Sequence, residues 1–220
     1  MNTTGLQLPA QYIITVGRTF GSGGRLLGRA IADRLGIGFY DKKLLVKAAE
    51  KSGLNHEYAR ENDERMPRML GGIIPFSMGY YPSGWFGASP TSGPDSIYNA
   101  QCDFIRELAQ SEPCVIVGRS SDYILRDIPN VVNIFVHAPA ESCAKRILER
   151  GDAATMAEAL TLAERSNKLR ANFYNFYTDK KWGAACSYDL CVDSTSMPMD
   201  ELADHIIDFV ARKLRKTDRQ

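Results

Sequence analysis

The sequence predicts an α/β fold in which helices cover both faces of a parallel sheet. Short apolar runs of β-prone residues alternate along the chain with longer stretches of helical periodicity, as strands and helices do in such folds. Two of the runs, 113–118 and 130–138, are rich in valine and isoleucine, which is typical of strands buried on both faces. A glycine-rich turn leaves the first run and enters the first helix.

The N-terminal elements follow from the same patterns. The run QYIITV, residues 11–16, is expected to form the first strand and to end at Gly17. The helix after it is expected to stop at Gly36, and its apolar face consists of Leu26, Leu27, Ala30, Ile31 and Leu35. The remaining N-terminal predictions are a short strand over 38–41 and two helices over 42–52 and 56–65, capped by Asp41 and Asn55.

Residues 66–94 differ in composition from the rest of the chain. They hold five of the ten prolines and six glycines, together with many aromatic residues and methionines. Proline and glycine at this density interrupt regular elements, and a long irregular segment in a compact domain is typically functional or mobile. Two interpretations stay open: a covering loop with its own small apolar cluster, or a flap that closes over a substrate site and excludes water.

The rest of the chain returns to alternating helices and strands. Helices are expected over 95–111, 139–151, 155–177 and 198–214, and strands over 113–118, 130–138 and 188–194. Pro139 and Gly151 mark the first position and the end of one of these helices. Ligands of parallel α/β sheets bind beyond the carboxyl ends of the strands, so side chains that follow the strands are the candidates for a binding site.

Composition excludes several classes of protein. The formal net charge of +1 provides no general basic field, so no nucleic-acid partner is expected. No run approaches the roughly 18 apolar residues of a membrane span, and the N-terminus lacks the features of a signal peptide. Five cysteines without a CxxC pair, and three histidines without metal-ligand spacing, favour a reducing cytoplasm and predict neither a disulfide framework nor a protein-bound metal.

The turn GRTFGSGG, residues 17–24, has the features of a phosphate-binding loop. Glycines let the backbone curl until successive N–H groups point at one anion, and the N-terminus of the following helix adds partial positive charge. The alternative interpretation is a tight turn without a ligand. On the first interpretation the nucleotide-binding residues are Gly17, Thr19, Gly21, Ser22, Gly23, Gly24 and Arg25.

Four motifs occur in the order in which one kinase family has them. On the motifs ITVGRTFGSGG, CVIVGRSSDYIL, ANFYNFYTDKKWG and YDLCVDSTSMPMDEL, the chain resembles the cytidylate kinase-like proteins. These are relatives of bacterial cytidylate kinase, a P-loop nucleoside monophosphate kinase. The resemblance runs from about Tyr12 to the last helix and fails over the Pro/Gly-rich insert. It implies a P-loop NTPase three-layer sandwich with a parallel five-stranded sheet in the order 2-3-1-4-5 and a helical lid.

The resemblance also implies one P-loop kinase-like domain over 1–220, in which 66–99 replaces the monophosphate-binding domain and 152–182 forms the lid region. The implied activity is ATP-dependent phosphoryl transfer to a nucleoside monophosphate, CMP or dCMP, with Mg2+ held by the substrate phosphates. The alternatives are a P-loop kinase of another small metabolite and a catalytically lapsed nucleotide-binding regulatory protein. Nucleotide substrates are the expected partners, no membrane is expected, and a homo-oligomer is left open.

The loop departs from the family pattern at three positions. In cytidylate kinase the loop reads glycine, four residues, glycine and lysine; here Arg18 stands at the first glycine and Gly24 at the lysine. Arg25 follows at a position where a magnesium-binding hydroxyl is common. The lysine neutralises charge on the transferring phosphates, and guanidinium groups bind phosphate well. Arg25, and after it Arg18, is therefore expected to supply the missing charge.

By resemblance, further charged residues surround the phosphates. Arg165 and Arg170 of the lid are expected to stabilise charge in the transition state, with a basic solvated helix face as the alternative. Arg119 is expected to bind the acceptor, with a structural ion pair to Asp122 or Asp127 as its alternative. The expected acceptor-binding set is Asp41, Lys47, Arg106, Arg119, Asp122 and Lys168.

Overall fold

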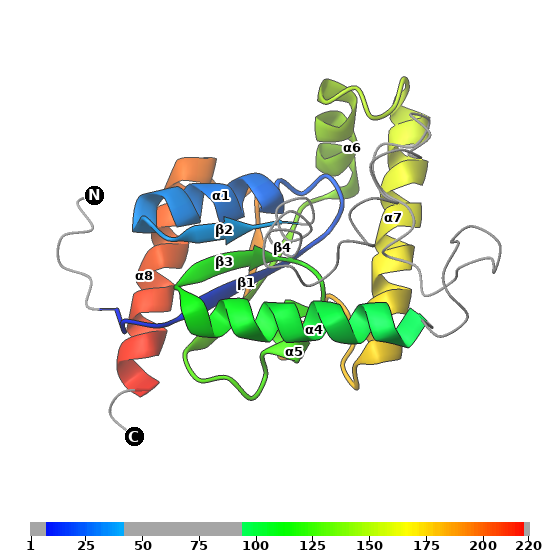
Figure 1. Cartoon of the computed structure of the whole chain (residues 1–220). Helices are drawn as coiled ribbons and strands as arrows, with labels where there is room; N and C mark the ends of the chain where they lie inside the picture. The colour runs from blue at the N-terminus through cyan, green and yellow to red at the C-terminus, as the bar shows by residue number, and fades with distance from the viewer. Residues whose placement is uncertain (1–7, 42–93, 218–220) are drawn as a thin grey trace.

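The computed structural model describes residues 8–41 and 94–217, and its centre is a five-stranded sheet in the order β2-β3-β1-β4-β5 (Figure 1). Each pair of neighbouring strands is parallel. The strands are β1 Ile13–Arg18, β2 Gly38–Tyr40, β3 Cys114–Val117, β4 Val131–His137 and β5 Leu190–Asp193. The expected parallel sheet and its strand order are therefore confirmed.

The helices alternate with the strands as the periodicity predicts. They are α1 Gly24–Leu35, α4 Pro94–Ser111, α6 Ala140–Glu149, α7 Met156–Tyr177 and α8 Met199–Thr217, with the short α5 Ser121–Ile124 and the 3-10 turn η1 Ala185–Ser187. Sequence periodicity missed α5 and η1, because about one turn of helix is too short to show a period. The helices expected over 42–52 and 56–65, and the 66–93 part of the insert, lie outside the described residues.

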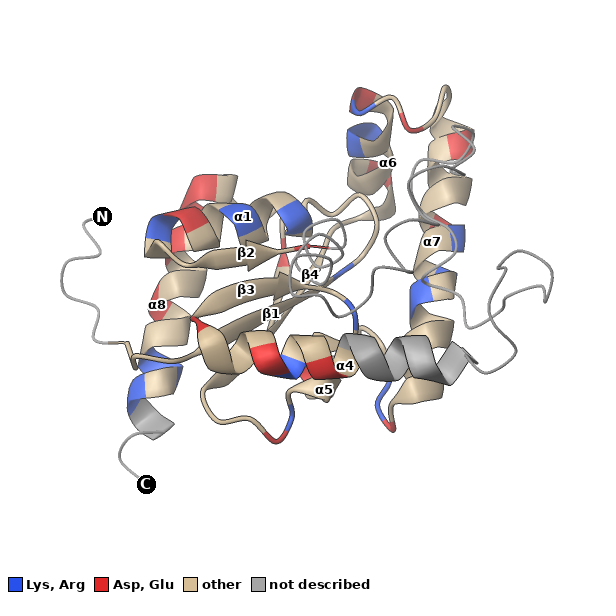
Figure 2. Cartoon of the chain, in the orientation of Figure 1, with Lys and Arg blue, Asp and Glu red and all other residues tan. Residues whose placement is uncertain are grey.

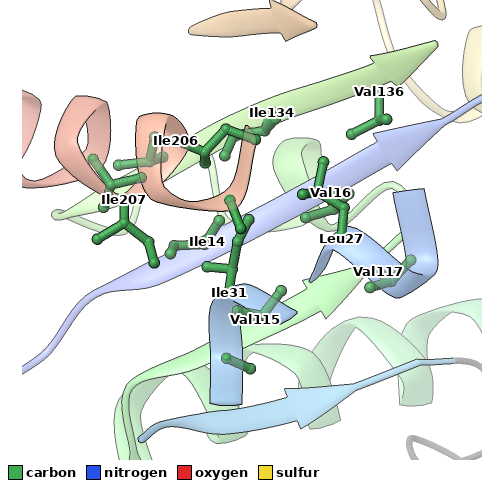
Figure 3. Close-up of a cluster of buried hydrophobic side chains, with 14 of the residues drawn as sticks. Ile14, Val16, Leu27, Ile31, Val115, Val117, Ile134, Val136, Ile206 and Ile207 are labelled. Atoms are coloured by element: carbon green, nitrogen blue, oxygen red, sulfur yellow. The ribbon is translucent and has the colours of Figure 1, made fainter. Parts of the chain in front are cut away.

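Helices cover both faces of the sheet and give the molecule three layers (Figure 1). On one face Ile14 of β1 packs with Leu27 of α1 and Ile206 of α8 (Figure 3). On the other face the neighbouring Ile13 packs with Ile105 of α4. Successive side chains of a strand point to opposite faces, so consecutive residues of β1 enter two different cores, and all of these side chains are buried.

Helices α6 and α7 lie side by side at the end of the sheet towards which the strands run (Figure 1). Their contact is apolar, with Ala144 and Ile147 of α6 against Ala159 and Ala163 of α7. This pair of helices includes most of the 152–182 segment expected to act as a lid. Movement of this region stays a prediction.

A capping box begins α7. The Thr155 side-chain oxygen accepts a hydrogen bond from the Glu158 N–H, and the Glu158 carboxylate accepts one from the Thr155 N–H, each at 3.2 Å. We expect Thr155→Ala to lower the free energy of unfolding by about 1 kcal/mol, measured by urea denaturation. Thr161→Ala on the same helix is the control. The exposed Thr161 hydroxyl donates a hydrogen bond to the Ala157 carbonyl one turn earlier and caps nothing. Equal losses in the two variants would contradict the capping role.

No helix within 8–41 or 94–217 is both long and apolar enough to cross a membrane.

The five cysteines are free thiols. No disulfide joins them, and all five lie in the described part of the chain. Burial raises the pKa of the Cys114 thiol to about 12, so this thiol stays protonated and unreactive at neutral pH.

Candidate functional site

The glycine-rich loop joins the carboxyl end of β1 to α1. Gly21 and Gly23 adopt left-handed backbone with φ of 82° and 81°, a conformation that glycine enters without strain. Space also excludes side chains here: a Cβ at Gly21 would lie 2.6 Å from the backbone oxygen of Cys143 on α6, and one at Gly17 would lie 2.8 Å from the Phe135 ring. The shape of the loop therefore depends on its glycines and on its close contact with α6.

Ser22 is a buried residue of the loop, and its hydrogen bonds fix the loop backbone. Its hydroxyl donates to the Thr19 carbonyl at 2.9 Å. Its own carbonyl accepts from Arg146 Nη1 at 3.1 Å and from the Ser194 hydroxyl at 2.5 Å. Residues of α6 and of the segment after β5 thus hold the loop, and sequence reasoning missed both. Their only signals are a basic residue in the helix after β4 and a serine directly after β5.

Several donors of the loop are left for a ligand. Four N–H groups make no hydrogen bond within the described residues, those of Gly21, Gly23, Arg25 and Leu26. Apart from the Cys143 thiol, the buried Thr19 Oγ1 likewise has no hydrogen-bond partner there. Donors grouped at a helix N-terminus are the arrangement that binds phosphate groups. The loop therefore has the donor arrangement of a phosphate-binding site.

The Arg18 side chain crosses the start of α1. Position 24 leaves room for it, because a Cβ at Gly24 would lie 2.7 Å from the Arg18 Cβ. At its far end the guanidinium lies against Gly118, where a Cβ would approach Arg18 Nη1 to 2.1 Å. Burial lowers the pKa of Arg18 to about 10, and the charge of Asp41 opposes this shift. Arg18 therefore stays charged at neutral pH between the carboxyl ends of β1, β2 and β3.

Arg170 of α7 approaches the same loop. Its Nη1 donates to the Arg18 carbonyl at 3.0 Å, and its guanidinium carbon lies 5.4 Å from the centre of the Phe20 ring, which Arg150 also contacts at 5.2 Å. The pKa of Arg170 lies well below its usual value because of burial and the charges of Arg18 and Arg150. Figure 2 shows basic positions on α1, α6 and α7 at this end of the sheet. Positive charges held together in this way favour an anion among them.

Arg25 is held by a carboxylate at the edge of the site. Its Nε lies 2.6 Å from Asp41 Oδ2, and its side chain is 61% exposed while the Asp41 side chain is buried. An exposed arginine that already pairs with a carboxylate is expected to contribute less to phosphate binding than Arg18, which is half-buried. Arg25 thus lies at the edge of the site and Arg18 lies against Gly118, and which of the two replaces the loop lysine stays a prediction.

The end of β3 runs into a strained turn made of Gly118, Arg119 and Ser120. All three have left-handed backbone, with φ of 78°, 66° and 52°, and two of them are not glycine. Strain of this kind collects at functional sites. Asp122, the next acidic residue, is buried and accepts a hydrogen bond from the Tyr174 hydroxyl at 2.6 Å, which joins α5 to α7. Asp127 pairs with its neighbour Arg126 at 3.6 Å.

Three more of the expected site residues are exposed on helices, and a fourth is not described by the structure. Arg106 is exposed on α4 and pairs with Asp103 at 3.0 Å. Arg165 and Lys168 are exposed on α7. Lys47 lies outside the described residues. The catalytic and acceptor-binding roles of these four basic residues stay predictions.

The pH dependence of stability is expected to report on Asp122. Burial raises the pKa of its carboxyl, against smaller opposite effects of the Tyr174 hydrogen bond and the Lys180 charge. The folded chain therefore holds this proton more tightly than the unfolded chain, and stability from this group is lost as pH rises through the folded pKa. Asp122→Asn has no proton to lose, so its stability relative to the wild type should rise with pH above the ordinary value of 3.8. Urea titrations between about pH 3 and pH 8 measure this, and a difference independent of pH would refute it.

A family model described as the cytidylate kinase-like family matches residues 13–196. Among curated proteins, a cytidylate kinase from Methanosarcina barkeri (strain Fusaro / DSM 804) is 30% identical over 104 residues, which are 45% of this chain and 56% of that protein. The chain therefore matches little more than half the length of this relative.

Two solved structures resemble the chain along nearly all of its length. An uncharacterized protein from Eubacterium ventriosum ATCC 27560 has 30% sequence identity and a TM-score of 0.67, with 91% of this chain and 98% of that one covered. Shikimate kinase from Acinetobacter baumannii, in complex with shikimate, has 14% identity and a TM-score of 0.52, with 97% and 98% covered. At this identity the second likeness is one of fold alone.

Proposed function

The chain belongs to the cytidylate kinase-like family, and from that premise we propose that it transfers the γ-phosphoryl group of ATP to a nucleoside monophosphate, CMP or dCMP. The observation that supports the proposal most is the loop between β1 and α1. It combines N–H donors that have no hydrogen-bond partner among the described residues with the nearby guanidinium groups of Arg18 and Arg170. Such an array suits a triphosphate, whose charge must be neutralised and whose phosphates must be held in place.

Magnesium is the expected companion of the donor. Mg2+ binds nucleotide phosphates and retains several waters, and it would neutralise charge on the β- and γ-phosphates. On the protein side the buried Thr19 hydroxyl is a candidate to assist, because it lacks a hydrogen-bond partner apart from a thiol among the described residues. The substrate phosphates would supply the other ligands.

The proposed transfer needs no covalent intermediate. An oxygen of the acceptor phosphate forms a bond to the γ-phosphorus while the bond from that phosphorus to the β,γ-bridging oxygen breaks. ATP and the monophosphate thereby become ADP and the diphosphate. A phosphate acceptor is already anionic, so the step requires no general base. The protein aligns the phosphates and neutralises their charge, with Arg18 and Arg170 on the donor side and Arg119 on the acceptor side.

A kinase of a small hydroxylated metabolite is the second candidate, and Asp41 is the observation that favours it. Its carboxylate is buried just after β2 and lies within electrostatic reach of Arg18. A hydroxyl acceptor must lose a proton during transfer, and a carboxylate in this place can accept it. A nucleotide-binding regulatory protein is the third candidate, favoured by Gly24 at the lysine position.

Phosphorus NMR on the full chain separates the three candidates. The protein is incubated with ATP, Mg2+ and, in turn, each nucleoside monophosphate and a set of small hydroxy acids. We expect equal amounts of ADP and CDP from ATP and CMP, and no products once a chelator removes the magnesium. Phosphorylation of a hydroxy acid but of no monophosphate would establish the second candidate instead. ATP binding without transfer to any acceptor would support the third candidate, a nucleotide-binding regulatory protein.

A further inference from the structure

Compared with the usual P-loop, this loop has a basic residue and a glycine at each other's positions. The usual P-loop begins with glycine and ends with lysine at the seventh position. Here Arg18 occupies the first position and Gly24 the seventh. The two positions meet in space, since a Cβ at Gly24 would lie 2.7 Å from the Arg18 Cβ and 3.3 Å from its Cγ. Side chains at both positions would overlap, so one of the two residues must be glycine.

The path of the Arg18 side chain is bounded by glycine at both ends. Gly24 lies beside the stem, and Val136 closes the space next to it, 3.1 Å from where a Cβ of residue 24 would be. At the other end a Cβ at Gly118 would lie 2.1 Å from Arg18 Nη1 and 2.9 Å from Cζ. Gly118 also has a φ of 78°, so both its conformation and its neighbour require glycine. Arg18 is thus built into the site and is not a mobile surface charge.

We propose that Arg18 replaces the loop lysine, and that Gly24 and Gly118 are the glycines that make room for its stem and its guanidinium. The inference rests on the proposed phosphoryl transfer and names the residue that supplies the missing charge. An arginine suits a cation that starts from β1, because its side chain is long and its forked head offers several N–H donors to phosphate oxygens. The carbonyl of Arg18 has a partner of its own, because it accepts a hydrogen bond from Arg170.

The exchange predicts that the lysine cannot be restored by a single substitution. In Gly24→Lys the new Cβ would overlap the stem of Arg18. In Arg18→Gly the overlap is removed but so is the charge. Only the double variant Arg18→Gly/Gly24→Lys recovers the usual order with one cation and one glycine. The effects of substitutions at positions 18 and 24 on protein stability and on phosphate affinity should therefore be strongly coupled.

A double-mutant cycle on the full chain tests the exchange, with the melting temperature and the affinity for inorganic tripolyphosphate as readouts. Gly24→Lys alone should lower the melting temperature by roughly 5 °C or more. Arg18→Gly alone should weaken tripolyphosphate binding about tenfold or more, and it should lower kcat more than it changes KM. The double variant should regain the melting temperature and most of the affinity. Arg25→Ala is the comparison within the loop and should weaken binding less than Arg18→Gly does.

Three results would overturn the exchange: a double variant that behaves as the sum of the single ones, a fully stable and active Gly24→Lys, or a larger loss of binding in Arg25→Ala than in Arg18→Gly. Melting and tripolyphosphate binding need no turnover. If the wild type transferred no phosphoryl group, the proposed kinase activity would be wrong, and these two readouts would still decide whether Arg18 and Gly24 have exchanged roles.

Discussion

Gly21→Ala is expected to lower the free energy of unfolding by roughly 2–5 kcal/mol. The residue has a φ of 82°, which costs an alanine about 1–2 kcal/mol on its own. The new Cβ would also lie 2.6 Å from the Cys143 carbonyl oxygen and 2.9 Å from its Cα. Both atoms belong to the backbone of α6, which cannot move aside as a side chain can. The variant should therefore separate the phosphate loop from α6, and nucleotide affinity should fall with stability.

Gly151→Ala is the matched control for this loss. Gly151 also has left-handed backbone, with a φ of 73°, but nothing lies within 4 Å of the position of its Cβ. Only the conformational cost applies to this variant, so its free energy of unfolding should fall by about 1–2 kcal/mol. The gain from a less flexible unfolded chain is common to both variants and cancels in their difference. Urea denaturation that found equal losses would show that the contact between the loop and α6 contributes nothing to stability.

Arg170→Ala is expected to lower kcat for phosphoryl transfer by about a hundredfold or more, with a smaller change in the KM for ATP. Its guanidinium donates to the Arg18 carbonyl at 3.0 Å and is crowded by the charges of Arg18 and Arg150. Removing it leaves the Arg18 carbonyl without this hydrogen bond and takes away a positive charge from the phosphate side. Arg170→Lys keeps the charge but loses the forked donor, so it should recover only part of the rate.

Arg212→Ala provides the control for removal of an arginine. Arg212 lies on α8, is largely exposed, and pairs with Asp208 at 2.7 Å one helical turn away. A surface pair of this kind contributes little to stability and has no contact with the loop. Steady-state kinetics should therefore match the wild type in Arg212→Ala and differ strongly in Arg170→Ala. If a folded Arg170→Ala had wild-type kcat, α7 would have no part in the transfer.

Local patterns in the sequence predict much of this fold. The valine-rich run that forms β3 and the apolar spacing that forms α1 both reflect burial, which a periodic pattern records directly. The order of the strands came from the resemblance to a kinase family, because pairing depends on contacts between distant residues. The short α5 was missed since its backbone is set by the left-handed turn before it, including Ser120, and not by any periodicity.

The glycines of the candidate site could be predicted from the sequence. The side-chain contacts between distant residues could not. Gly21 and Gly23 follow from the need for left-handed backbone in a tight loop. The contacts that distinguish Arg18 from Arg25 were not predictable, because the Arg25–Asp41 pair and the approach of Arg18 to Gly118 form only in the folded chain. The contacts of Arg146 with the loop likewise join residues far apart in sequence. No local pattern distinguishes such an arginine from one on a solvated surface.

Calorimetric titration with a bisubstrate analogue tests whether the loop between β1 and α1 holds donor phosphates beside an acceptor monophosphate. The analogue joins adenosine to cytidine through a pentaphosphate chain and is titrated with Mg2+ present. A linked ligand binds both parts of a site at the entropic cost of one, so we expect it to bind at least about a hundredfold more tightly than ATP. Arg18→Gly should weaken binding of the analogue about tenfold or more, because Arg18 is proposed to contact the donor phosphates. An analogue affinity no higher than that of ATP, or one unchanged in Arg18→Gly, would contradict this arrangement.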